Sequence, residues 1–474
     1  MSYIEADDRN QLILLPESLE DYVGSENAVR FIEAFVESVD LVELGFRHAT
    51  TERKGRPPYS PADLLKLYIY GYINRMRSSR DLEKQTHYNL EVIWLLRRLR
   101  PDFKTIADFR KNNTEALKKV CREFTAFCRS LGLYGGQLVA VDSSRFKAVN
   151  AKDRNYNEKK LQGQIARIDR KIEEYFRQLD ENDQKEADTP SLTAEELREK
   201  IEELKKYRQE KEKLSDQLKK SGDTQISTTD PDARALHLGQ AVQVGYNVQF
   251  AVDQKNKLIA THEVTNSRTD LKELSNISKK AKEALQVESL EVVADSGYYS
   301  SEQLKMCEDS GIAPYVAKPD RRNQRPGYFD QTRFQYDSAA DNYLCPAGEK
   351  LRFLYVRKPK LRVRYYGNPT ACQNCSIKSR CTPRKAGRLI LRWTEQAVLD
   401  RMISRIRAYP QKLKERKAII EHTFGTLKSS MNQGYFLMKG LKKVSAEMSL
   451  SVLAFNFKRA INIKGTARLI QALP

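Results

Sequence analysis

The spacing of apolar residues divides the chain into a helical part and a mixed part. Residues 1–130 carry helical patterns whose starts are capped, as at Ser60–Asp63, where a serine precedes a proline and an acid follows two positions later. After residue 135 the pattern changes, and 137–149 is Val-rich and apolar on both faces, which is typical of a central strand. The sequence therefore predicts a helical N-terminal domain followed by a sheet.

A long helical segment interrupts the sheet at 155–221. Its apolar residues recur every three or four positions, which is the spacing of a coiled-coil seam. The two stripes consist of Leu161, Ile165, Ile168, Ile172, Tyr175 and Leu179, and then of Leu197, Ile201, Leu204, Tyr207, Leu214 and Leu218. Two such stripes joined by a polar loop predict an inserted antiparallel helical hairpin.

Strands resume after the hairpin. Residues 242–253 and 257–266 flank a short polar turn, as in a β-hairpin, and 290–297 is a Val-rich strand between two helical patterns. This order predicts an α/β fold with a mixed sheet. The expected domains are 1–130 (helical, DNA-binding), 131–154 with 222–320 (catalytic core), 155–221 (hairpin insertion), 321–393 (basic four-cysteine insert) and 394–474 (helices completing the core).

Positive charge is concentrated late in the chain. Among 474 residues, 83 Lys and Arg stand against 63 Asp and Glu, a formal charge of +20. Residues 345–392 hold 13 basic side chains and one acid, and 401–464 hold 14 basic side chains and three acids. Such focused charge favours a polyanionic partner over a merely solubilising surface. No apolar run approaches about 18 residues, so we expect a cytoplasmic protein without a membrane partner.

Two aspartates directly follow apolar strands. Asp142 ends the run V-A-V, and Asp295 ends V-V-A. Ligands of α/β sheets bind at the carboxyl ends of strands, and an acid there must be paired, metal-bound or exposed. Either residue alone could simply cap the next helix, but two in similar settings favour a metal site.

Glu421 is the third notable acid. On a helix, Lys414, Lys417, Glu421 and Lys428 share one face beside an apolar stripe that would dock the helix on the sheet. An acid among lysines suits a metal site near phosphates. The alternative is an ordinary Lys417–Glu421 pair of the i, i+4 kind.

Four of the seven cysteines form a second set. Cys345, Cys372, Cys375 and Cys381 include a C-x2-C pair within a basic segment of little apolar content. Four thiolates suit a tetrahedral structural zinc, which would stabilise so small a core. Redox pairing is the alternative.

Arginines gather at the junctions between the N-terminal helices. Arg77 and Arg80 lie at one such junction and are expected to contact DNA, as in a helix-turn-helix reader. An all-helical accessory domain with ordinary surface arginines is the equally weighted alternative.

Several segments together resemble the DDE transposases of bacterial insertion sequences, in particular the eleven-eighty-two group. They extend from about residue 55 to 440 and read RPPYSPADLLKLYIYGYINRMRSSRDLEKQ, PDFKTIADFR, VAVDSSRFKAVNA, TTDPDARAL, GYNVQFAVD, VVADSGYY, CPAGEKL, CQNCSIKSRCT and IEHTFGTLK. The resemblance implies an RNase H-like catalytic core whose acids are Asp142, Asp295 and Glu421. Lys428 matches a basic position of the family's signature, whereas its preceding tyrosine and arginine are here Lys414 and Lys417.

This resemblance implies a transposase that binds terminal inverted repeats, cleaves at the element's ends and joins the 3′ ends to target DNA. Two Mg²⁺ (or Mn²⁺) ions about 3.5–4 Å apart would promote both steps. Asp142 is expected to bridge the ions, with Asp295 and Glu421 each completing one shell. We expect a synaptic homodimer in association with the nucleoid. A DNA-binding protein that no longer cuts is the alternative, and a structure-specific nuclease is a third possibility.

Overall fold

The computed structural model describes residues 18–50, 57–184, 192–238, 241–319, 327–357 and 363–474. Parts of four expected domains, namely the helical region at 1–130, the core at 222–320, the hairpin and the cysteine insert, lie outside these residues. No helix in the described part is long and apolar enough to cross a bilayer.

The described N-terminal part is helical, as predicted. Its α-helices are α1 (Ala28–Glu37), α2 (Pro61–Ile73), α3 (Ser79–Tyr88), α4 (Leu90–Leu95), α5 (Phe103–Asn112) and α6 (Thr114–Ser130). The predicted cap of α2 is present, since the Ser60 hydroxyl accepts a hydrogen bond of 3.2 Å from the Ala62 amide. The α2 helix is apolar around most of its circumference because neighbours surround it.

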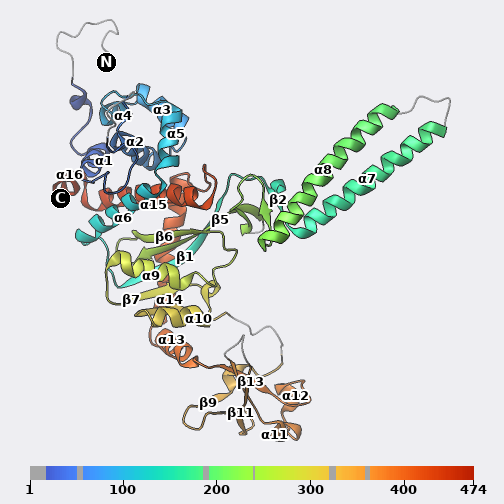
Figure 1. Cartoon of the computed structure of the whole chain (residues 1–474). Coiled ribbons are helices and arrows are strands. Elements are labelled where there is room, and N and C mark those ends of the chain that lie inside the picture. The colour runs from blue at the N-terminus through green and yellow to red at the C-terminus, as the bar shows by residue number, and fades with distance from the viewer. Residues whose placement is uncertain (1–17, 51–56, 185–191, 239–240, 320–326, 358–362) are drawn as a thin grey trace, which may run out of the picture.

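A mixed sheet lies at the centre of the molecule, which confirms the expected α/β fold (Figure 1). Its strands run in the order β6–β5–β1–β7–β8, with β4 paired to the first part of β5. The strand bounds are β1 (Leu138–Lys147), β4 (Arg234–Leu238), β5 (Ala241–Asp253), β6 (Ile259–Thr265), β7 (Leu290–Ala294) and β8 (Ile312–Val316). The central strand β1 is antiparallel to β5 and parallel to β7.

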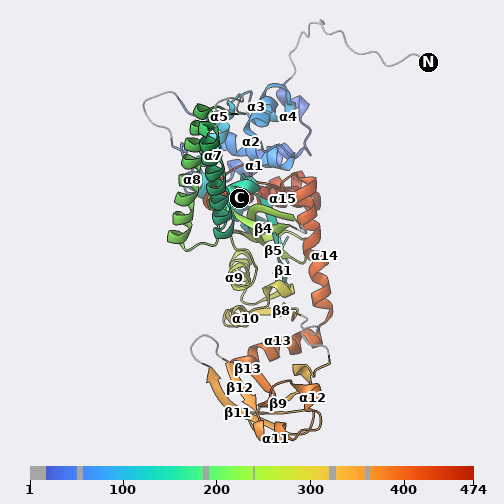
Figure 2. The same cartoon turned by 90° about the vertical axis from the view of Figure 1, so that its right-hand side faces the viewer.

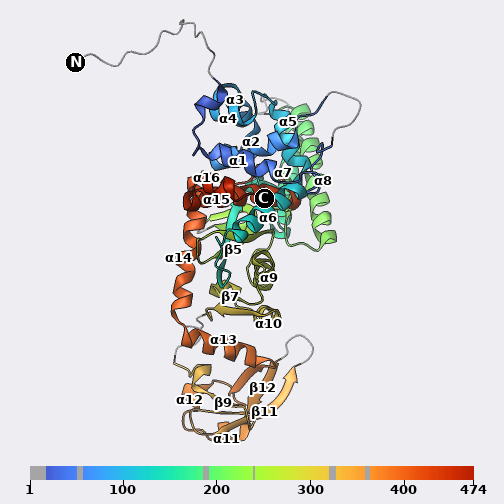
Figure 3. The same ribbon diagram turned by 90° about the vertical axis from the view of Figure 1, so that its left-hand side faces the viewer.

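Helices cover both faces of this sheet. The α9 helix (Leu274–Leu285) lies on one side and α14 (Gln411–Gly425) on the other, as Figures 2 and 3 show from opposite directions. The α10 helix (Ser301–Glu308) connects β7 to β8, and a π-helical turn, η6 (Thr426–Ser430), directly continues α14.

The predicted hairpin is present and projects away from the sheet (Figure 1). It consists of α7 (Glu158–Gln184) and α8 (Ala194–Ser221), which pack along each other. The capping box at the start of α8 forms as expected, with the Glu196 amide bonding the Thr193 hydroxyl at 3.2 Å. Small paired strands, β2 (Asn155–Tyr156) and β3 (Ile226–Ser227), join the hairpin's base to the body.

The cysteine-bearing insert forms a separate five-stranded antiparallel sheet at the far end of the molecule. Its elements are β9 (Gln335–Asp337), β10 (Asn342–Leu344), β11 (Lys350–Arg357), β12 (Val363–Gly367), α11 (Pro369–Gln373), α12 (Lys378–Cys381) and β13 (Leu389–Trp393). The α13 helix (Gln396–Ala408) leads from it back to the body.

The C-terminal helix α15 (Leu441–Lys464) joins the N-terminal helices to the sheet. It packs against α2, α6 and β6, and α16 (Thr466–Gln471) follows it and packs on α1. The ring of Phe457 stacks on Phe124 of α6 with centroids 4.0 Å apart. One continuous hydrophobic core therefore spans the helical region and the sheet, so position 130 separates secondary-structure types and not two cores.

Candidate active site

Asp142 and Asp295 lie on two neighbouring parallel strands, Asp142 within β1, which continues to Lys147, and Asp295 directly after β7. The parallel register of β1 and β7 sets Leu138 beside Glu291 and Ala140 beside Val293. Continuing the same register by two residues sets Asp142 beside Asp295. Neighbouring strands lie about 4.8 Å apart, so the two carboxylates emerge from adjacent inner strands, near the carboxyl end of β7.

Asp142 occupies an electrostatically unusual position. Its burial raises the pKa of the carboxyl to about 6, opposed by the nearby Arg416 guanidinium and the Ser143 amide, and supported by the charges of Asp295 and Asp270. The Ser143 amide donates to Asp142 Oδ1 at 2.8 Å. Asp295 is held by the Gly297 amide, which donates to its Oδ1 at 2.9 Å. A cation placed between these acids would therefore be attracted strongly.

Arg416, which sequence reasoning missed, is the α14 side chain that reaches Asp142. Its Nη1 forms an ion pair with Asp142 Oδ2, and the two side chains are only 16% and 18% exposed. The sequence held a signal, because Arg416 lies four residues before the apolar Ile420 and so on the sheet-facing side of the helix.

A second missed acid, Asp270, lies close enough to raise the pKa of Asp142. Two buried amides of β5 fix it, since Asn247 Nδ2 and Gln249 Nε2 donate to Asp270 Oδ1 at 2.8 and 2.7 Å. The Tyr298 hydroxyl in turn donates to Gln249 Oε1. Two amide side chains at alternate positions of an otherwise apolar strand were the sequence signal for this polar network.

Glu421 lies on the exposed face of α14 together with Lys414 and Lys417. A helix advances about 100° per residue, so Glu421 points about 140° away from Arg416, which faces the sheet. Ile420 is buried as predicted, and Phe424 contacts Phe250 of β5 with ring centroids 5.4 Å apart. The apolar stripe thus docks α14 as expected and turns Glu421 outward.

Lys428 stays near the sheet edge that carries Asp142. Its Nζ lies 4.9 Å from the ring centroid of Phe146. Phe146 is four residues beyond Asp142 on β1, so the two side chains share one face of the sheet. Burial and the charge of Arg145 lower the pKa of Lys428.

Arg77 does not have the exposed position expected of a DNA contact. It is 4% exposed, its Nη1 donates to the Tyr435 carbonyl at 2.7 Å, and it lies 3.7 Å from the buried Glu447 carboxylate. A guanidinium buried against a carboxylate has no surface left for a phosphate. The expectation for Arg77 was therefore wrong, whereas Arg80 is exposed above the ring of Phe103 and stays a prediction.

The four cysteines of the insert lie around Cys381. Burial chiefly raises the pKa of the Cys381 thiol, and the charges of Cys345, Cys372 and Cys375 raise it further. Gly387, with a φ of +89°, packs so closely on Cys372 that a Cβ would lie 2.8 Å from its Sγ. As their side chains stand in the described residues, these four thiols are not grouped closely enough to hold one metal ion.

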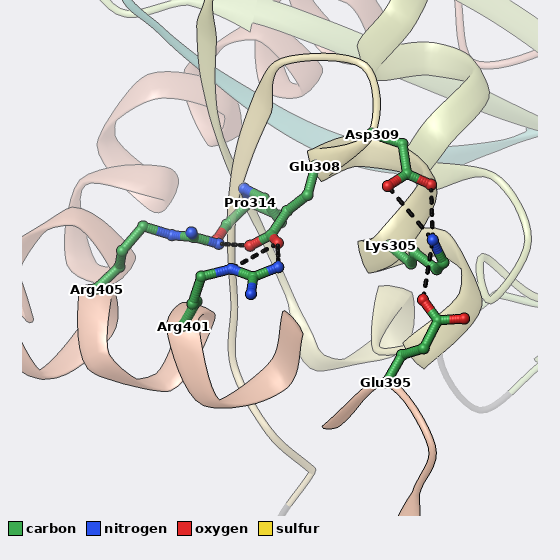
Figure 4. Close-up of polar contacts among 7 residues, drawn as sticks. All are labelled: Lys305, Glu308, Asp309, Pro314, Glu395, Arg401 and Arg405. Atoms are coloured by element: carbon green, nitrogen blue, oxygen red, sulfur yellow. Dashed lines mark hydrogen bonds and ion pairs between the residues drawn. The ribbon is translucent and has the colours of Figure 1, made fainter. Parts of the chain in front are cut away.

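Ion pairs between α10 and α13 hold α13, the helix that follows the insert, against the central sheet's side of the molecule (Figure 4). Glu308 accepts from Arg401 Nη2 at 2.5 Å and from Arg405 Nη2 at 2.7 Å. Lys305 bridges Asp309 and Glu395 at 3.1 and 2.9 Å. These contacts fix the start of the helical segment that continues into α14.

As the side chains stand, the structure does not gather any predicted metal set completely. Among the described residues, no three His, Cys, Asp or Glu side chains are grouped so that they could hold one metal ion. Asp142 and Asp295 are neighbours, and Arg416 supplies a cation at Asp142 where a metal would be expected.

Two family models match parts of the chain. Residues 17–112 match the family described as Transposase domain (DUF772), and residues 344–461 match the family described as Transposase DDE domain. No curated protein matches the chain. Among solved structures, the cryo-EM structure of the piggyBac transposase synaptic complex with hairpin DNA is similar over 94% of this chain and 79% of that chain, at 8% identity and a TM-score of 0.33.

Proposed function

The two matched families identify the chain as an insertion-sequence DDE transposase, and from this premise we propose that it cleaves DNA at the ends of its element and joins the 3′ ends to target DNA. The observation that carries the proposal is the parallel register of β1 and β7, which brings Asp142 and Asp295 together. The strand order β6–β5–β1–β7–β8 supports an RNase H-like core for this chemistry.

In this proposal Asp142 and Asp295 hold Mg²⁺ or Mn²⁺, with Glu421 as the third acid. Carboxylate oxygens suit these hard cations. The ions, two per site, would supply activation of the attacking oxygen and stabilisation of the leaving oxygen. Two of these acids are neighbours and Asp142 already pairs with a cationic side chain, Arg416, whereas Glu421 points outward.

The chain's own side chains orient the DNA. Lys414 and Lys417 are exposed on the outer face of α14, and Lys428 lies along the same strand face as Asp142. Their charges would attract the phosphates on either side of the scissile bond. Arg80 is proposed to contribute to terminal-repeat binding by the N-terminal helices.

We propose a structural zinc for Cys345, Cys372, Cys375 and Cys381. Bound zinc would order the insert, whose 13 basic residues over 345–392 would then contact the DNA backbone. A homodimer would hold the two element ends, with the projecting hairpin of α7 and α8 contacting the second subunit. The element's own replicon, and hence the nucleoid, is its proposed place of action.

The test uses linear DNA carrying the ends that flank the gene, with Mg²⁺ added. We expect end-specific nicking and strand joining by wild-type protein, and a loss of more than about 1,000-fold in Asp142→Asn and Asp295→Asn, because metal-assisted charge stabilisation is removed. The control Glu302→Gln, which removes an exposed acid from α10, should retain activity.

Separate measurement of Glu421→Gln decides whether the third acid belongs to the site. DNA binding, measured by fluorescence anisotropy, should persist in every variant. If all proteins bind the ends equally and none nicks them, the enzyme proposal is wrong and the DNA-binding alternative stands.

A further inference from the structure

We propose that Arg416 is the internal counter-ion of Asp142, which occupies this carboxylate in the metal-free protein and competes with the divalent cation for it. Arg416 thereby acts as a positioning residue that sets how tightly the site takes up metal. The inference rests on the proposed function, since it concerns the same acid.

Both oxygens of Asp142 are engaged in the structure. Oδ1 accepts from the Ser143 amide at 2.8 Å, and Oδ2 pairs with Arg416 Nη1. The ion pair is largely shielded from water, with side chains 16% and 18% exposed, so it is stronger than a surface pair. A metal at Oδ2 would therefore have to share this oxygen with the guanidinium or displace it.

Electrostatic repulsion also opposes the simultaneous presence of Arg416 and a divalent cation at Asp142. A divalent cation on Asp142 would stand next to the guanidinium, and the two like charges would repel at short range. The charges of Asp295 and Asp270 act on the same place and favour whichever cation is present. Arg416 and metal are therefore alternatives at one position.

The exchange requires only a side-chain movement. Ile419, Ile420 and Thr423 are buried and keep α14 on the sheet. Lys412, one turn before Arg416, is tied to Glu291 of β7 and lies 3.4 Å from the Tyr315 hydroxyl. The helix backbone is thus fixed on both sides of Arg416, whose long side chain can turn away while α14 stays docked.

Metal binding without DNA tests the inference. Full-length metal-free protein is titrated with Mn²⁺, and free Mn²⁺ is measured by electron paramagnetic resonance. We expect Arg416→Gln to bind on the order of tenfold more tightly than wild type, because the competing charge is gone. Arg416→Lys, which keeps the charge, should stay within about threefold of wild type. Arg407→Gln, which removes the same charge from the exposed end of α13, should match wild type.

A second measurement uses wild-type protein and so does not depend on the folding of a variant. Phenylglyoxal modifies accessible arginines, and we expect Mn²⁺ to raise the modification rate of Arg416 several-fold while Arg407 is unchanged. Unaltered Arg416 reactivity on Mn²⁺ binding would overturn the inference. So would a well-folded Arg416→Gln protein that binds Mn²⁺ no more tightly than wild type.

Asp142→Asn separates this failure from failure of the proposed function. Saturable Mn²⁺ binding that Asp142→Asn abolishes supports the metal site, and the Arg416 variants then decide the inference alone. Absence of such binding in wild type rejects both the metal site and the competition.

Discussion

The central sheet and the cysteine-bearing insert differ in how much hydrophobic core stabilises them. The sheet shares one continuous core with the N-terminal helices, and α15 is buried between them over most of its length. The insert has a small core formed by Phe334, Tyr343, Leu351, Tyr366, Cys381 and Ile390. Consecutive apolar residues of β11 from Phe353 to Val356 are each at least 36% exposed, so this part of the strand leaves apolar surface uncovered.

The sheet therefore depends on hydrophobic burial, whereas the insert needs another source of stability. A sheet with so small a core buries too little apolar surface to offset its ordering entropy. Thiolate–metal bonds would supply that stability to the insert, and the ion pairs of Figure 4 hold it against the body. Asp142 and Asp295 lie in the central sheet, which is stabilised by burial. The insert, which we propose to contact DNA, needs the other source of stability.

Removal of zinc should produce the largest difference in stability between the insert and the central sheet. Structural zinc contributes about 10–16 kcal/mol to folding in small domains, so chelation or Cys372→Ser should unfold the insert while the core stays folded. Limited trypsin digestion with mass spectrometry should then show cleavage confined to 327–393, with release of one zinc per chain. Ser376→Ala, beside the C-x2-C pair, is the control. An insert that stays protected after chelation contradicts the zinc site.

Phe457→Ala tests the opposite region. The ring is fully buried and stacks on Phe124, so its loss should cost about 3–5 kcal/mol. Because the core is shared, the N-terminal helices and the sheet should lose stability together, as seen by hydrogen exchange during urea unfolding. The exposed Ile463→Ala on the same helix should change stability by less than about 1 kcal/mol. Destabilisation limited to the helices would argue against one core.

The pH dependence of the free energy of unfolding should reveal the raised pKa of Asp142 in the central sheet. The folded-state pKa of Asp142 is about 6, above the value of about 3.9 for an unfolded chain. The folded state therefore binds the proton more tightly than the unfolded chain does. The stability that this proton contributes to the folded state is lost as pH rises from about 4 through 6.

In metal-free buffer, wild type should thus lose about 2–3 kcal/mol relative to Asp142→Asn between pH 4 and pH 7. Urea unfolding of both proteins across this range measures the difference. A stability gap that does not change with pH would mean that Asp142 titrates normally in the folded protein.

Glu308→Gln should have the smallest effect, at the joint between the two regions. Glu308 accepts from both Arg401 and Arg405, but the arginines are partly exposed, so the loss should be about 1 kcal/mol. Hydrogen exchange in α13 should become faster while the exchange of β1 is unchanged. Glu302→Gln on the same helix serves as the matched variant, and equal exchange in both would show that the ion pairs do not hold α13.

The periodic elements were predictable because their signals are local. The hairpin of α7 and α8, the β5–β6 pair and the position of Asp295 directly after β7 all follow from residue spacing that neighbours in sequence determine, whereas β1 continues past Asp142 to Lys147. The burial of Arg77 was not predictable, because Tyr435 and Glu447 lie more than 350 residues away along the chain. An arginine at a helix junction has the same local pattern whether it faces DNA or the core.

Local residue patterns were thus enough to predict which side chains share a helix face, which acids follow apolar runs, and where positive charge collects. The parallel register of β1 and β7 and the orientation of α14, which turns Arg416 rather than Glu421 toward Asp142, could be seen only in the folded molecule. The physical reason is that periodicity is a property of neighbouring residues. Strand register and helix orientation depend instead on the burial of apolar surface between segments far apart in the chain.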